Sequence, residues 1–143
     1  MNSKTKNSLT IFGIYGGAIL LSLIFANSFG LIHSFFFETT CADSIFIIAN
    51  FDAGCRIEGF IYAFIFWLAI FLFTFLEQKI AWVSYIFGTL LFWLLFIYII
   101  ITENLRKGNE IVGSLIIMLV SFAIGYGLAF CVRKFIKIFE QKK

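Results

Sequence analysis

Residues 59–76 read GFIYAFIFWLAIFLFTFL, residues 77–79 read EQK and residues 80–101 read IAWVSYIFGTLLFWLLFIYIII, and this stretch decides the fold. Neither apolar run contains a charged residue. An α-helix rises about 1.5 Å per residue and the hydrocarbon layer of a bilayer is about 30 Å thick, so both runs can cross it, the first only just. Because only three residues separate them, the two helices must be antiparallel neighbours. The stretch predicts a transmembrane helical hairpin.

Two further uncharged apolar runs, residues 9–32 and 111–132, flank this hairpin. The first run follows Lys4 and Lys6 and could be taken for a signal peptide with cleavage near Ala26. The apolar core of a signal peptide is usually about 7 to 15 residues, and this run is longer, so we interpret it as a membrane anchor. The sequence therefore predicts an all-α, four-span transmembrane helical bundle that forms a single integral membrane domain over residues 1–143.

The composition supports a membrane protein. The chain is 62% hydrophobic, 20% aromatic and 13% charged, whereas soluble domains are about half apolar and a quarter charged. The net charge is +3, but the eleven Lys and Arg residues form no basic face with interleaved aromatic residues, which is the footprint of nucleic-acid binding. We expect no nucleic-acid partner.

The distribution of Lys and Arg predicts the orientation. An even number of spans places both termini on one side, together with the turn at residues 77–79. Cytoplasmic segments carry an excess of Lys and Arg, so we expect both termini in the cytoplasm of a cell-membrane protein. The terminal side holds eight basic residues and the opposite side three, namely Lys4, Lys6, Lys79, Arg133, Lys134, Lys137, Lys142 and Lys143 against Arg56, Arg106 and Lys107.

The one larger external loop, residues 33–58, contains two cysteines. Cys41 and Cys55 flank an apolar run at residues 44–51. If the outside is oxidising, a disulfide that closes this loop would stabilise the protein by about 3 kcal/mol by restricting the unfolded chain. We expect a bridge between Cys41 and Cys55. Two free thiols are the alternative, because sequence spacing does not establish the separation of the Cα atoms.

Ionisable residues inside membrane spans usually mark enzymes and proton-coupled transporters, and the four runs contain none. His33 is the only histidine, and with two distant cysteines it gives no metal-ligand spacing. We therefore expect no catalytic residues, no cofactor and no metal. The Ser, Thr and Tyr hydroxyls and the Asn27 amide are expected to bond between helices or to their own backbone.

Small residues recur every fourth position in the first and fourth spans, whereas the second and third are rich in Phe and Trp. In lipid, backbones that approach closely along such rows are a main source of helix association. We expect the first and fourth spans to be the contact helices, packed on each other or on a second chain, and the aromatic spans to face lipid or a larger partner. Leucine at Ala69, in an aromatic span without such a row, should matter less than leucine at Gly17 or Gly125. The predicted packing interface consists of Gly13, Gly17, Ala18, Ser22, Ala26, Gly30, Ser121, Gly125 and Ala129, and a further row of Ala123, Gly127 and Cys131 lies beside it.

The tail, residues 133–143, continues the fourth span as a basic cytoplasmic extension. Each Lys or Arg near an anionic leaflet contributes about 1 kcal/mol to surface attraction, and such clusters can also bind one headgroup selectively. Contact with lipid headgroups is expected for Arg133, Lys134, Lys137, Lys142 and Lys143.

These features favour a non-enzymatic accessory or interaction subunit that binds a membrane-protein partner, or further copies of itself, through the small-residue faces of the first and fourth spans. One alternative is an oligomeric channel or carrier for a small solute, lined by hydroxyl and amide groups. A second alternative is a membrane thiol-redox protein, although Cys41 and Cys55 are fourteen positions apart and lack the close Cys-x-x-Cys spacing of reactive pairs.

Overall fold

A computed structural model describes residues 3–37, 53–102 and 108–141. These residues form four α-helices: α1 (Ser3–Phe37), α2 (Ala53–Phe75), α3 (Gln78–Thr102) and α4 (Gly108–Gln141). The predicted all-helical class is confirmed for this part of the chain. Within α1, α2 and α4, the segments Ser8–Ile32, Glu58–Phe75 and Val112–Phe139 are long and apolar enough to cross a membrane.

The helices extend beyond the apolar runs of the sequence. α1 continues to Phe37 and α2 already begins at Ala53, so both ends of the expected external loop are helical. The basic tail is helical as far as Gln141. A helix pairs its own backbone N–H and C=O groups whether its side chains are apolar or polar, and for this reason apolar runs mark only the part of a helix that lipid can surround.

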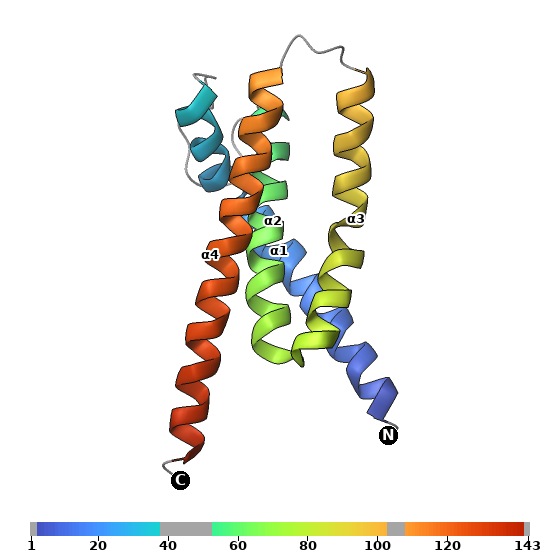
Figure 1. Ribbon diagram of the computed structural model, residues 1–143, viewed down its shortest axis with the longest axis vertical. Helices are drawn as coiled ribbons and strands as arrows, with labels where there is room; N and C mark the ends of the chain where they lie inside the picture. The colour runs from blue at the N-terminus through green and yellow to red at the C-terminus, as the bar shows by residue number, and fades with distance from the viewer. Residues whose placement is uncertain (1–2, 38–52, 103–107, 142–143) are drawn as a thin grey trace.

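The hairpin between α2 and α3 is as tight as the three-residue separator predicts. The Leu76 amide still donates to the Leu72 carbonyl at 3.0 Å, and the Ala81 amide donates to the Glu77 carbonyl at 2.8 Å. α2 therefore ends and α3 begins within a few residues. Figure 1 shows this turn at the same end of the molecule as the first turns of α1 and the last turns of α4.

α2 is the central helix of the bundle. It packs against α1, α3 and α4, whereas α1 and α4 contact each other over only a short stretch. The α3 backbone stays apart from α1 and α4, and side chains make its contacts with them. In Figure 1, α1 crosses behind α2 at a steep angle, and α3 stands apart from α4. The fold is thus a spine with three flanking helices.

The side chains of α2 supply half of the buried hydrophobic residues described. Tyr62, Leu68 and Leu72 are fully buried, and Phe64 and Phe73 are nearly so. α3 has the opposite character, since most of its described apolar side chains are exposed. The expectation that both aromatic spans face lipid or a larger partner is therefore wrong for α2. For α3, whose side chains are exposed, it stays a prediction.

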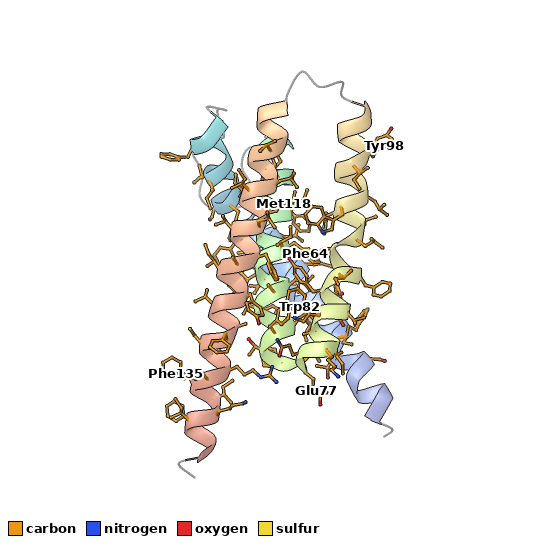
Figure 2. All side chains as sticks on the ribbon, in the orientation of Figure 1. Phe64, Glu77, Trp82, Tyr98, Met118 and Phe135 are labelled. Atoms are coloured by element: carbon orange, nitrogen blue, oxygen red, sulfur yellow. The ribbon has the colours of Figure 1, made fainter. Side chains whose placement is uncertain are left out.

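Aromatic rings connect α2, α3 and α4 near the hairpin. Phe73 makes edge-on contacts with Tyr126 and Trp82, with ring centroids 4.8 and 5.0 Å apart, and Tyr85 packs on Phe122 at 4.8 Å. These separations lie in the range that favours aromatic pairs beyond simple burial. Figure 2 shows Trp82 and Phe64 among the helices, and Tyr98 on the outer side of α3.

Candidate functional site

The small-residue row of α1 packs against α2. Ala18, Ser22 and Ala26 are buried, and the Ser22 hydroxyl donates to the Ala18 carbonyl at 2.5 Å within the same helix. Opposite them, Gly59 of α2 lies directly on the α1 backbone. A Cβ atom at Gly59 would overlap the Ala26 carbonyl oxygen and would lie 2.9 Å from the Gly30 Cα. The two backbones therefore meet at Gly59.

The row of α4 packs on another part of the same helix. Ser121, Gly125 and Ala129 are buried. A Cβ atom at Gly125 would lie 2.7 Å from the Phe66 carbonyl oxygen and 3.2 Å from the Ala69 Cβ. Ala69 itself is fully buried and lies opposite Gly125, so the structure gives no reason for leucine to matter less at Ala69 than at Gly125.

The expected packing of the first span on the fourth is not what the structure has, because both helices pack chiefly on α2. The reason is steric. Small residues leave a shallow groove along a helix, and the large side chains of another helix can fill it closely. The ring of Phe71 lies 3.5 Å from where a Cβ of Gly17 would be, and the rings of Phe25 and Trp67 pack at 5.6 Å.

Not every residue of the predicted rows is enclosed. Gly13 is exposed and Gly17 is half-buried. The neighbouring row of α4 also faces outward, since Ala123 and Gly127 are exposed and Cys131 is an exposed free thiol. A Cβ atom at Gly13 or Gly127 would have no neighbour within 4 Å. The predicted interface therefore includes an enclosed part and an open part.

The sequence did not predict one contact between α1 and α3. The Tyr15 hydroxyl of α1 donates a hydrogen bond to the Ser84 carbonyl of α3. Gly88, one turn further along α3, lies under the phenol ring, and a Cβ atom there would lie 2.9 Å from Tyr15 Cζ. Gly59 and Gly88 are the only glycines in the two aromatic runs. A single glycine among large side chains was the sequence signal that could have predicted a close helix contact at each position.

The polar groups at membrane depth are largely engaged. The Thr89 hydroxyl donates to the Tyr85 carbonyl at 2.9 Å, and the hydroxyls of Tyr62 and Ser114 are hydrogen bonded between α2 and α4. Within the described chain, the buried Trp67 Nε1 and Thr74 Oγ1 have no hydrogen-bond partner. The hydroxyl bonds follow the expected pattern of bonding between helices or to the backbone.

Two apolar clefts flank α4. The first, of about 310 Å³, lies between α3 and α4 with Ile65 of α2 as its floor, and we call it the α3–α4 cleft. Its α3 wall is a single helical face with a spacing of three or four residues, and its α4 wall is formed by three further residues. The walls consist of Trp82, Tyr85, Ile86, Thr89, Leu90 and Trp93 of α3 and Met118, Leu119 and Phe122 of α4. The second cleft, of about 250 Å³, lies between α1 and α4 over Phe66.

A third cavity, also of about 310 Å³, has a polar lining and lies where the basic part of α4 passes the α2–α3 turn. We call it the basic cavity. It is lined by Phe73 of α2, Gln78 of α3, and Tyr126, Phe130, Arg133 and Lys137 of α4. Figure 2 shows Glu77 of the turn and Phe135 of α4 at this same end of the molecule.

Only some of the residues predicted to contact lipid headgroups line the basic cavity. Arg133 and Lys137 line it, Lys134 is exposed and does not, and Lys142 and Lys143 lie outside the described residues. Gln78 and Tyr126 are lining residues that the sequence interpretation missed, because their proximity to Arg133 depends on how α4 packs beside the hairpin.

The other predicted site features remain open. Cys41 lies outside the described residues, and Cys55 is in the first turn of α2 with no described side chain, so their disulfide stays a prediction. His33 lies in α1, also without a described side chain. Among the described residues, no group of three or more His, Cys, Asp or Glu side chains could hold a metal ion.

Comparison with known proteins gave no relative to guide the interpretation. No family model, no curated protein and no solved structure matches this chain. Any function must therefore be inferred from the geometry of the bundle, its clefts and its basic cavity.

Proposed function

We propose that the chain is a non-enzymatic integral membrane protein that crosses the cell membrane four times, with both termini in the cytoplasm, and acts as an interaction subunit of a larger membrane assembly. The 25 residues of α3 are about 37 Å long, enough for a fourth crossing. The excess of Lys and Arg on the side of the termini and of the α2–α3 turn supports the orientation.

The observation that carries this proposal is the α3–α4 cleft. α3 packs on α2 and meets α4 through the rings of Trp82 and Tyr85, which lie against Phe122 near the hairpin. The cleft beside these rings is walled by bulky apolar and aromatic side chains. The α3 wall extends from Trp82 to Trp93, about three helical turns or 16 Å. A groove of this length and direction matches the contact surface of another helix.

The chemistry of the cleft also suits an apolar partner helix. The Thr89 hydroxyl is already bonded to its own helix, so its hydrogen needs no further partner. Rigid aromatic walls and the adaptable Met118 side chain can form a close fit to a helix of another protein. In lipid such packing, and not hydrophobic exclusion, supplies the association free energy. The proposed partner surface thus lies on α3 and α4, because the small-residue rows first assigned to this role are largely occupied by α2.

The test compares partner recovery by variants on the face of α3 that lines the cleft with recovery by variants on the face that does not. Trp93→Ala and Leu90→Ala enlarge the α3–α4 cleft, whereas Phe87→Ala and Leu91→Ala alter exposed residues that do not line it. Each variant is expressed in its native membrane, purified in mild detergent and analysed by quantitative mass spectrometry. We expect a membrane protein recovered in stoichiometric amount with the parent to be lost from the first pair and retained by the second.

Three other outcomes would contradict the proposal. Recovery of stoichiometric lipid in place of a protein would assign the cleft to an acyl chain. A dimer in native mass spectrometry that only the cleft variants dissociate would assign it to a second copy of this chain. Equal partner recovery from all four variants would show that the cleft has no role in binding.

The alternatives lack a favourable observation. A channel or carrier would need hydroxyl groups directed to a common lining, but those of Tyr15, Ser22 and Thr89 are bonded to backbone carbonyls on different helices. The thiol-redox alternative has no described cysteine pair to support it.

A further inference from the structure

Residues with hydrogen-bond donors from two helices, α3 and α4, line the basic cavity. On α4, Tyr126, Phe130, Arg133 and Lys137 follow a spacing of four, three and four residues, which places them on one helical face. Gln78 is the first residue of α3 and completes the lining from the other side. The cavity therefore combines a guanidinium, an ammonium, a carboxamide and a phenol.

The charge of the cavity is uncompensated by the part of the protein that the structure describes. Arg133 and Lys137 are four residues apart on α4, and like charges at this spacing repel each other. The described lining includes no carboxylate, and Glu77, next to Gln78, is exposed and is not a lining residue. An anion in the cavity would remove this repulsion.

The cavity has a charged side and an aromatic side. Arg133 is the first charged residue after the apolar run of α4, so it lies where that helix leaves the hydrocarbon layer. Phe73, Tyr126 and Phe130 form an aromatic wall on the side of the apolar run. A ligand that fits both parts has an anionic group at the water boundary and an apolar portion that continues along the aromatic wall into the membrane.

We propose that the basic cavity binds the phosphate of one anionic phospholipid, with the acyl chains lying against the aromatic wall. The Arg133 guanidinium can donate two parallel hydrogen bonds to phosphate oxygens, and the Lys137 ammonium adds a second charge. The Gln78 carboxamide and the Tyr126 hydroxyl supply neutral donors. Lys134 is exposed beside Arg133 and takes no part in this site.

Native mass spectrometry of the whole protein in an uncharged detergent tests the proposal. The probes are dioleoylphosphatidylglycerol, dioleoylphosphatidylcholine and inorganic phosphate. We expect one phosphatidylglycerol to bind more tightly than phosphatidylcholine. The R133A/K137A double variant should weaken it by about tenfold or more, while K134A, which removes a charge from the same turn, should stay within about twofold of the parent. Arg133→Lys, which keeps the charge and loses the planar fork, should give an intermediate loss.

Three results would overturn the proposal. Equal binding of the two lipids by the parent protein would show that no anion is selected, and this comparison needs no variant to fold. General surface attraction depends on the number of charges removed, so a loss of binding free energy for K134A of about half that for R133A/K137A would reduce the effect to such attraction. Inorganic phosphate that displaces phosphatidylglycerol at similar concentration would assign the cavity to free phosphate. Far-ultraviolet circular dichroism checks that the double variant keeps its helix content.

Discussion

Gly59 of α2 faces the Ala26 carbonyl oxygen of α1 so closely that a single added carbon atom would overlap it. The neighbour is backbone and not a flexible side chain, so it cannot move aside without moving a whole helix. This relationship makes the α1–α2 interface the most sterically restricted contact in the described bundle.

We expect Gly59→Ala to destabilise the protein by about 1 to 3 kcal/mol, the usual cost of overpacking a tight interface. Gly13→Ala is the matched control, because a Cβ atom there would have no neighbour within 4 Å. Unfolding of both variants in mixed micelles, followed by circular dichroism, gives the comparison. Equal stability of G59A and the parent would mean that the helices are farther apart than the structure places them.

The α4 interface provides a second pair of glycines only two residues apart. Gly125→Ala should destabilise the packing of α4 on α2, since the new Cβ atom would lie 2.7 Å from the Phe66 carbonyl oxygen. Gly127→Ala, with an open environment, should be neutral. Ala69→Leu should be at least as harmful as G125A, because Ala69 is fully buried. A tolerant Ala69 in the same unfolding assay would indicate that this face of α2 is exposed.

The hydrogen bond from Tyr15 to Ser84 joins α1 to α3. We expect Tyr15→Phe to lower the free energy of unfolding by about 0.6 to 2 kcal/mol, the range measured for hydrogen bonds between membrane helices. Ser84→Ala should be neutral, because the acceptor is the backbone carbonyl and the substitution retains it. If S84A is as destabilising as Y15F, the Ser84 side chain and not its carbonyl is the functional group.

The orientation can be tested by impermeant thiol labelling of intact cells. In a background with Cys41, Cys55 and Cys131 replaced by serine, single cysteines are introduced at Ser3, Ser44 or Gln141. In the proposed orientation, which rests on the excess of Lys and Arg, both termini lie in the cytoplasm, so only the Ser44 variant should react. Labelling at position 3 or 141 would reverse the proposed orientation.

The bridge between Cys41 and Cys55 is tested by peptide mapping of the mature protein without reductant. We expect a linked pair of peptides, because both cysteines lie on the proposed outer side, where thiols meet an oxidising environment. Cys131, on the proposed cytoplasmic side, should be recovered as a free thiol, in keeping with its exposure. Quantitative alkylation of Cys41 and Cys55 would show that the loop is open.

The sequence by itself determined the helices. Uninterrupted apolar runs, the separator at residues 77–79 and the basic stretch after Val132 predicted helical segments, a tight hairpin and a charged helix end, and the structure contains all three in its described part. These features follow from local chemistry. A backbone in lipid must satisfy its N–H and C=O groups by hydrogen bonds within the helix, and two helices joined by a short connection must pack side by side.

Only the tertiary structure decided which helix is central. In lipid an apolar helix face gains little from being buried, so hydrophobicity does not reveal what packs on what, and steric fit decides. The large side chains of α2 fill the grooves that small residues leave on α1 and α4, and Gly59 admits the α1 backbone. The basic cavity has the same origin, since Gln78 and Arg133 are 55 positions apart in the sequence and meet only because α4 packs on α2 beside the start of α3.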